Sequence, residues 1–457
     1  MPQTSGLPAC GPGDIRAGDG AAGAPQVPPE SMAEAASSRL VSWRALGSAA
    51  FAAYFAGSLV SNLGTWLQNT AQMLLAYQLT HSALAVGVVS CAQFSGFLLF
   101  GPWAGTIADR LGPMRVLIGA QLVSGFVAAD MAYHRLAGGL TEHDLVLGAL
   151  VIGFAYALAL PVQTALIPAL VGQPATKQRV QGAMAMNSVS YNAGRALAPV
   201  LAVVVLASIG AAWAFALNAI TFFLFAATLL AISGRVADRL AEGDRPAWNI
   251  VRPARLHPRM LLLMAMVAAV TLADDPVLVL GPAMAHQVLH VSRAWPAFFL
   301  AALGLGTILG SLFPTRPPTS RGAALPLLVL AGSMIVFVLG ISVWTSWIAA
   351  VCAGIGALLT GSSVQAEVAA MTHGRETPQL MALWALAWAG AKPIASLADG
   401  WLAVHHGVLI AGIVLATPAA VIAILERWLP GKLRDRTKEA SRRYRRRQEA
   451  AAQAAAD

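Results

Sequence analysis

The stretch Gly101–Arg115, GPWAGTIADRLGPMR, joins two long apolar runs at about 83–107 and 114–135. Each run is long enough to cross a lipid bilayer as a helix, and a junction this short makes the pair a hairpin. Glycines in the junction let the two helices and the turn between them approach closely. The charges that mark where the chain leaves and re-enters lipid are Asp109, Arg110 and Arg115.

The composition is typical of a polytopic membrane protein. Of the 457 residues, 57% are hydrophobic and 11% are charged, whereas about a quarter of a soluble protein is charged. Runs of about 20 apolar residues recur along the chain. They lack the alternating pattern of barrel strands, so helices are the structure that satisfies their backbone in lipid.

Twelve apolar runs are candidate transmembrane helices, and a polar loop divides them six and six. They lie at about 47–78, 83–107, 114–135, 143–171, 180–208, 211–233, 260–289, 294–314, 323–343, 346–371, 378–404 and 407–429. The expected parts are a disordered cytoplasmic tail, an N-terminal bundle, a cytoplasmic linker, a C-terminal bundle and a basic cytoplasmic tail, at 1–38, 39–233, 234–259, 260–429 and 430–457.

Basic residues gather at one end of these spans. Of the 30 Lys and Arg residues, two lie inside spans (Arg195 and Lys392) and two at the opposite end (Arg135 and Arg293), while the others lie in or beside the tails and alternate junctions. This asymmetry predicts a multi-pass protein of the cell membrane with both termini in the cytoplasm. The basic tail at 430–457 either lies on anionic lipid or stays in solution.

Internal repetition indicates that the two halves are related. Gln181–Arg195 aligns without gaps on Pro378–Lys392, so that Met184 matches Met381 and both segments end on a cation. The hairpin has a partial counterpart at Gly306–Arg321, which has no acidic residue. Two related six-helix halves are a known way of building a transporter.

The spacing of glycine, aspartate and arginine in the hairpin resembles the loop between helices 2 and 3 of major facilitator superfamily transporters. With Ser61–Thr80 and Asn187–Pro199, the chain resembles the bacterial drug, secondary-metabolite and siderophore exporters of that superfamily. The resemblance implies an all-α polytopic membrane protein with twelve transmembrane helices in two pseudo-symmetric six-helix bundles. It also implies a cytoplasmic gate at the hairpin, built from Gly105, Asp109, Arg110, Gly112 and Arg115.

Glu367 lies near the cytoplasmic end of its span and is expected to act as a gate or loop partner. The alternative for the hairpin charges is that they only form the turn and set the topology. None of the gate residues is expected to touch substrate.

Four ionisable residues are predicted near the middle of the membrane, where each is a functional candidate. At the helical rise, Arg195 and Lys392 lie ~22 Å into their spans, and Asp274 and Asp275 lie ~21 Å into theirs. Two adjacent carboxylates do not easily ionise together in a cavity, which predicts a proton-coupling site. The alternative is a permanent ion pair that locks helices together. Pro276 follows and is expected to break the helix there.

A polar stripe on the first span is the main candidate for a substrate cavity. Asn62, Thr65, Asn69 and Gln72 are spaced 3, 4 and 3 and share one helical face, with Gln68 beside them. Their amides either line the cavity or hydrogen-bond to neighbouring helices. Further cavity candidates, of which the aromatic ones either stack on a planar substrate or pack in the core, are Gln163, Tyr191 and Trp388.

The expected function is secondary active transport, as proton-coupled efflux of a small amphipathic organic compound by alternating access. Facilitated diffusion or import on the same fold is the nearest alternative, and a non-transporting sensor or scaffold is the alternative from another class. No enzyme activity, cofactor or metal site is expected, because no catalytic set or ligand cluster has a fitting context. The expected partners are the small-molecule substrate, protons and membrane lipid, with no nucleic acid, and the protein is expected to be monomeric.

Overall fold

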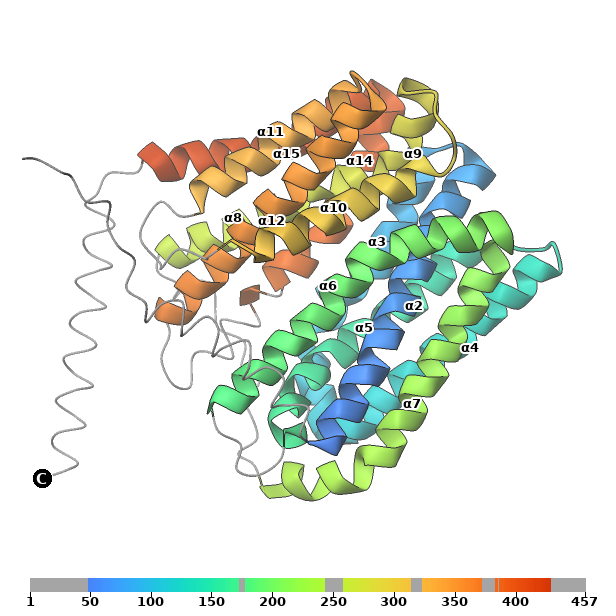
Figure 1. Ribbon diagram of the computed structural model, residues 1–457, viewed down its shortest axis with the longest axis vertical. Helices are drawn as coiled ribbons and strands as arrows, with labels where there is room; N and C mark the ends of the chain where they lie inside the picture. The colour runs from blue at the N-terminus through green and yellow to red at the C-terminus, as the bar shows by residue number, and fades with distance from the viewer. Residues whose placement is uncertain are drawn as a thin grey trace, which may run out of the picture.

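The computed structural model shows a protein built from helices (Figure 1). The residues it describes are 48–171, 177–242, 258–313, 323–371, 383–384 and 386–428. No strand occurs among these residues, so the all-α prediction is confirmed. The predicted tails at 1–38 and 430–457, and the central part of the predicted linker, lie outside the described residues.

The helices form two bundles, which Figure 1 shows as a blue-to-green group and a yellow-to-red group. The N-terminal half contains α2 (Ala49–Thr80), α3 (Ala83–Leu111), α4 (Pro113–Leu136), α5 (Glu142–Leu170), α6 (Lys177–Ser208) and α7 (Ala211–Glu242). The C-terminal half contains α8 (Pro258–Val279), α9 (Gly281–Ala283), the π-helical turn η3 (Met284–Val288), α10 (Trp295–Ser311), α11 (Ala324–Leu339), α12 (Val343–Met371), α14 (Ala391–His406) and α15 (Val408–Trp428).

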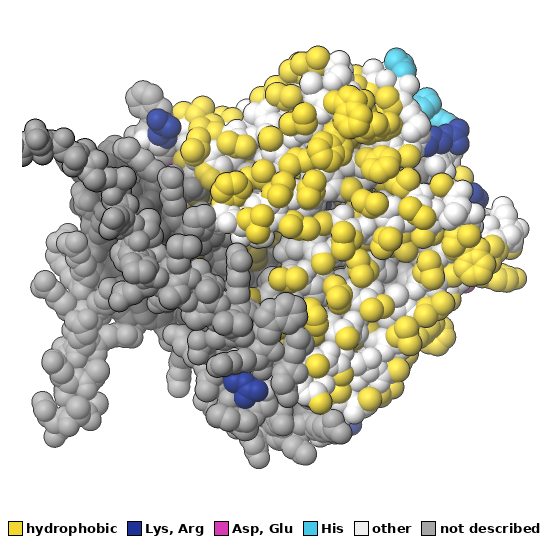
Figure 2. Space-filling model, viewed as in Figure 1, with side chains coloured by type: hydrophobic (Ala, Val, Ile, Leu, Met, Phe, Trp, Pro, Cys, Tyr) yellow, Lys and Arg dark blue, Asp and Glu magenta, His cyan; other side chains and the backbone are white. Residues whose placement is uncertain are grey.

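Many of these helices are long enough and apolar enough to cross a membrane. Among the described residues, eight helices are long and apolar enough, and α10 and α11 are shorter apolar helices. Figure 2 shows hydrophobic side chains spread over the visible face of both halves. Large apolar side chains such as Phe126 and Trp344, 66% and 64% exposed, are what a lipid-facing surface requires.

The predicted hairpin is present, with one turn residue between its helices. α3 ends at Leu111, Gly112 has a φ of 89°, and α4 begins at Pro113. A residue with a side chain is strained at this φ, which explains the glycine. Arg110 and Arg115 are exposed. The surroundings of Gly105 and the side chain of Asp109 lie outside the described part, so the cytoplasmic gate stays a prediction.

Helices α7 and α8 differ from the sequence prediction. α7 continues to Glu242, beyond the predicted span end at 233, because a helix does not have to stop where it leaves the lipid. Pro276 does not break its helix, and this prediction was wrong. α8 continues to Val279, since proline removes only its own donor, and the carbonyl of Pro276 still accepts a hydrogen bond from Leu280 at 2.9 Å.

Glycines in α10 allow close helix contacts, as their position inside an apolar span predicts. A Cβ atom added to Gly306 meets the carbonyl oxygen of Val351 at 2.0 Å, on α12. A Cβ atom added to Gly304 meets the Cα of Ala196 at 2.4 Å, on α6 of the other half. Backbone approaches backbone at both positions, so no side chain fits there.

Gly306→Val is therefore expected to lower the stability of the protein by about 1–3 kcal/mol, as overpacking does in a filled interior. The measurement is thermal unfolding of the purified protein in detergent. Gly332→Val is the matched control on α11, because an added Cβ there has nothing within 4 Å. Equal losses in the two variants would mean that helix propensity, not the contact with Val351, sets the cost.

The two halves meet closely at one end, which we name the predicted outer end and which holds the turn between α2 and α3. There α3 packs against α14, and the hydroxyls of Ser90 and Ser396 lie 2.8 Å apart. A Cβ atom added to Gly87 meets the carbonyl oxygen of Ser396 at 2.4 Å. The Gln287 amide also donates to the Tyr77 hydroxyl across the halves at 3.2 Å. This end is closed by direct contact.

Candidate functional site

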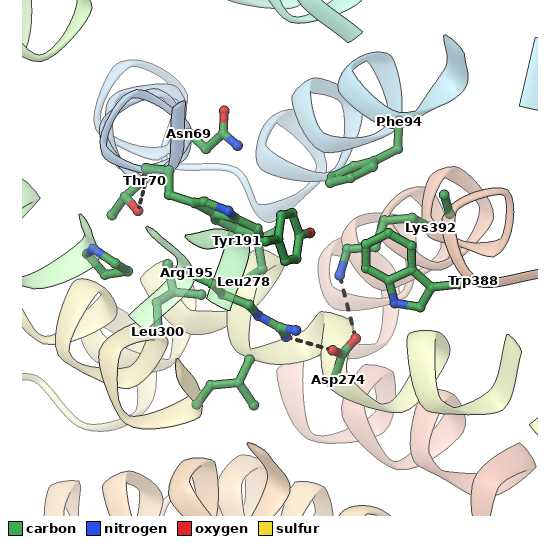
Figure 3. A pocket seen from close by; sticks show the side chains of 14 residues that line it. Asn69, Thr70, Phe94, Tyr191, Arg195, Asp274, Leu278, Leu300, Trp388 and Lys392 are labelled. Atoms are coloured by element: carbon green, nitrogen blue, oxygen red, sulfur yellow. Dashed lines mark hydrogen bonds and ion pairs between the residues drawn. The ribbon is translucent and has the colours of Figure 1, made fainter. Parts of the chain in front are cut away.

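A cavity lies between the two halves and contains charged and aromatic side chains (Figure 3). It holds about 670 Å³ of atom-free space, part of which is open to solvent. Its lining residues are Trp66, Asn69, Thr70, Phe94, Tyr191, Arg195, Pro199, Asp274, Leu278, Leu300, Leu303, Trp388, Ala389 and Lys392. We name it the central cavity.

The four ionisable residues predicted at mid-membrane depth meet at one wall of this cavity. A guanidinium nitrogen of Arg195 donates to Asp274 at 2.9 Å. Nζ of Lys392 lies 3.6 Å from Asp274 and 2.7 Å from Asp275. In Figure 3 both cationic side chains point at the Asp274 carboxylate. The two positive charges and the two negative charges therefore balance at this wall of the cavity.

The backbone explains how these groups meet. Asp274 and Asp275 are adjacent on α8, where neighbouring side chains point about 100° apart. Lys392, in the first turn of α14, has a long flexible stem and reaches both carboxylates. Arg195 comes from α6 in the other half, so its bond to Asp274 joins the two halves.

Burial makes these pairs sensitive to any change of charge. The side chain of Asp275 is 0% exposed and that of Asp274 is 6% exposed, against 16% for Arg195 and 15% for Lys392. A buried charge that loses its partner is strongly destabilising. Asp275 is thus enclosed, while Asp274 and the two cations border the central cavity.

Aromatic rings line the cavity from both halves. Tyr191 contacts Trp66 at 5.8 Å and Trp388 at 6.2 Å between ring centroids, both nearly edge-to-face. Trp388 is stacked on Trp384 at 6.5 Å with an interplanar angle of 9°. Nζ of Lys392 lies 5.9 Å from the ring centre of Phe94. The predicted cavity residues Tyr191 and Trp388 therefore do border the central cavity.

A second pocket, which we name the N-half pocket, lies beside the first, inside the N-terminal half. Its polar lining is uncharged, and it shares several aromatic residues with the central cavity. The amide oxygen of Gln121 is buried without a hydrogen-bond partner. The lining residues are Asn62, Thr65, Trp66, Asn69, Gln93, Phe94, Ala120, Gln121, Ser124, Ile152, Gly153, Ala155, Tyr156, Ala159, Tyr191 and Phe222.

The predicted polar stripe of the first span divides between two roles. Asn69 borders both pockets, and Asn62 and Thr65 border the N-half pocket. Gln72 instead donates to the carbonyl of Leu145 at 2.7 Å. Gln68 accepts from the amide of Asn218 at 2.8 Å. The lining of the two pockets does not include Gln68, Gln72 or Gln163.

Glu367 lies in an ion-pair cluster within the C-terminal half. Arg259 of α8 donates to both of its carboxylate oxygens, at 2.7 and 2.8 Å, and to Glu426 of α15 at 2.9 Å. This cluster fastens the ends of α8, α12 and α15 together. The expected gate role of Glu367 stays a prediction, since these contacts lie within one half.

A buried ionisable residue of α14 was missed by the sequence prediction. Asp399 lies in α14, inside the predicted span 378–404, and is 0% exposed. The rule that flags Asp274, namely that an ionisable group within a span is a functional candidate, applies to it equally. Asp399 was overlooked because it stands apart in sequence from the other charges.

Two helical bundles with a charged cavity between them are the architecture of transporters of the major facilitator type. Residues 40–452 match the family model described as transmembrane secretion effector. The chain belongs to this family.

Curated relatives of known activity are similar at low identity. The chain is 25% identical to the staphyloferrin A transporter of Staphylococcus aureus over 45% of this chain and 51% of that protein. It is 25% identical to the enterobactin exporter EntS of Shigella flexneri over 63% of this chain and 68% of that protein. The match thus spans about half of the first relative and about two-thirds of the second.

Solved structures support the fold. The peptide-transporter-family protein PepTSo matches with a TM-score of 0.67 at 13% identity, over 86% of this chain and 99% of that chain. A bacterial homologue of the lysosomal transporter Spinster, in an inward-facing and occupied conformation, matches with a TM-score of 0.60 at 15% identity, over 84% and 97%.

Proposed function

We propose that this protein is a secondary active exporter that moves a small amphipathic organic compound out of the cell in exchange for protons. The observation that carries the proposal is the Arg195–Asp274 pair at the central cavity, which joins the two halves at 2.9 Å. Any motion that separates the halves at this level has to break that pair. The charge of Asp274 is thereby linked to conformation, which is what coupling requires.

In the proposed cycle, a proton that binds Asp274 removes the charge that holds Arg195 and Lys392 beside it. The two cations then repel each other, and the contact between the halves weakens. Release of the proton on the other side restores the pair. Arg195 stays charged throughout, so the carboxylate is the group that switches.

The substrate class follows from the two pockets and from the relatives. Aromatic rings from both halves suit a planar or apolar part of a ligand, and the amides of the N-half pocket suit its neutral polar groups. The relatives are named for enterobactin and staphyloferrin A. We propose a siderophore, drug or secondary metabolite of amphipathic character.

The proposed architecture has twelve transmembrane helices in two six-helix bundles, 39–233 and 260–429. Both termini lie in the cytoplasm of a bacterial cell membrane, and the chain acts as a monomer. The eight helices of membrane length and the two shorter apolar ones support this arrangement. We count α2 and α14 as the remaining two transmembrane helices. They are less apolar than the others because polar residues on them, such as Asn69 and Lys392, line the central cavity.

The proposal is tested by a toxicity and accumulation screen in cells with and without the protein, using siderophores, drugs and dyes. We expect at least one amphipathic compound to accumulate less in cells with the protein, and a proton uncoupler to abolish the difference. A difference that survives the uncoupler would indicate facilitated diffusion. No difference for any compound would favour a non-transporting sensor or scaffold.

Trp388→Ala is expected to weaken the apparent affinity for the transported compound by about fivefold to tenfold, as loss of an aromatic contact does. The measurement is the concentration dependence of transport for a compound found in the screen. Trp344→Ala is the matched control, since Trp344 is 64% exposed and lies outside both pockets. A similar loss in both variants would place substrate elsewhere.

A further inference from the structure

Asp399 is a buried carboxyl group that the proposed cycle does not use. It lies in α14, is 0% exposed, and neither of its carboxylate oxygens has a hydrogen-bond partner. An ionised carboxylate without a partner is very unfavourable in an interior of low dielectric constant. Asp274 and Asp275 are also buried, but both have a cation within 4 Å.

Asp399 belongs to a stripe along one face of α14. Lys392, Asp399 and His406 are spaced seven residues apart, which is about two helical turns and ~10 Å for each interval. Ser396 lies between the first two and shares the face, as positions four and three residues apart do. Lys392 borders the central cavity, and His406 is exposed in the last turn of the helix. The stripe runs from the cavity to the predicted outer end.

Hydroxyl groups connect this stripe to the ion pairs. The hydroxyl of Ser396 lies beside the Asp275 carboxylate, and it is 2.8 Å from the hydroxyl of Ser90 on α3. A serine hydroxyl donates and accepts at once, so it can take up one proton while giving up another. Asp275 in turn contacts Lys392 at 2.7 Å.

Among the described residues, three charged groups act on Asp399. They are Asp274 and Asp275 from α8 and Lys392 from its own helix. α3 contributes the neutral thiol of Cys91 near Asp275. The charged residues of α15 are at its opposite end, Glu426 and Arg427.

We propose that Asp399 is a proton-binding site on a route along α14 that joins the predicted outer end to the Asp274–Asp275 pair. This proposal for Asp399 rests on the proposed function, because the route supplies the proton that the antiport consumes. A proton from the outer solution bonds to a carboxylate oxygen of Asp399. When it moves on, that O–H bond breaks, the Ser396 hydroxyl accepts the proton and gives up its own, and Asp275 receives one. One proton enters at Asp399 and one arrives at Asp275, and the Ser396 hydroxyl ends with the same number of protons as it began.

The first test needs no substrate. Infrared difference spectra of the full-length protein, purified in detergent and titrated with acid and base, report the C=O stretch of each protonated carboxyl group. We expect a band that is absent in Asp399→Asn and displaced in Asp399→Glu, which keeps the carboxyl group. Asp130→Asn is the control, because the Asp130 side chain is 69% exposed, and it should leave that band unchanged. A spectrum of Asp399→Asn that matches the unaltered protein would overturn the proposal.

The second test separates proton movement from substrate movement in proteoliposomes, with a compound found in the screen as the probe. Asp399→Asn is expected to slow transport driven by a pH gradient by about 100-fold or more. Exchange of labelled for unlabelled compound at equal pH, which needs no net proton movement, should continue at the unaltered rate. Loss of both in Asp399→Asn, with neither recovered in Asp399→Glu, would make Asp399 a structural residue. If the transport rate of the unaltered protein does not depend on the pH gradient, the proposed function is wrong. The infrared spectra then decide by themselves whether Asp399 binds a proton.

Discussion

Asp274→Asn is expected to lower transport driven by a pH gradient by about 100-fold or more, because it removes the carboxylate that takes up and releases the proton. The amide keeps the shape of the side chain but has no charge to hold Arg195 at 2.9 Å. The pair then no longer joins α6 to α8. The measurement is the initial rate of uptake into proteoliposomes with an imposed pH gradient.

Asp130→Asn is the control for this prediction, since Asp130 lies on the exposed surface of α4 beside His134 and touches neither pocket. Full retention of gradient-driven transport in Asp274→Asn would remove the proton role of this residue. The exchanged pair Arg195→Asp with Asp274→Arg distinguishes the structural alternative. If the exchange restores expression without transport, coupling needs the original arrangement, whereas restored transport would rule out a coupling role for the pair.

Lys392→Met is expected to destabilise the protein by about 3–5 kcal/mol, the cost of removing one partner from a buried ion pair. Methionine fills much of the space of the lysine stem but leaves Asp275, 0% exposed, without its cation. The second neighbour, Asp274, keeps its bond to Arg195. The measurement is thermal unfolding in detergent, at a pH where the unaltered protein is most stable.

A double variant shows whether the loss comes from the stranded charge. Lys392→Met with Asp275→Asn removes both members of the pair, so most of the lost stability should return. Lys392→Arg keeps the positive charge and should stay closer to the unaltered protein than Lys392→Met does. A single variant Lys392→Met that unfolds at the unaltered temperature would mean that Asp275 does not depend on this lysine.

The level at which the ionisable groups meet could be predicted from the sequence, because helical rise converts position in a span into depth. Arg195, Asp274 and Lys392 do lie together at the central cavity. Which groups pair could not be predicted, because the reach of a long side chain decides it. The angle of about 100° between adjacent helix residues does not tell which carboxylate takes the lysine, and Lys392 lies closer to Asp275 than to Asp274.

The polar stripe of α2 shows a second limit of periodicity. Helical spacing places residues on one face, but several helices surround α2, so the same stripe meets a pocket at one level and a neighbouring helix at another. Asn69 borders both pockets, while Gln72, nearly one turn further, donates to Leu145 on α5. The spacing alone cannot distinguish these surroundings.

The most direct measurement of the central claim uses proteoliposomes that contain the purified protein and a compound identified by the screen. With an acidic lumen, proton-coupled exchange predicts that the compound accumulates inside above its external concentration, that the lumen becomes more alkaline as it does so, and that an uncoupler abolishes both changes. Equal concentrations on the two sides, whatever the pH gradient, would contradict proton-coupled export.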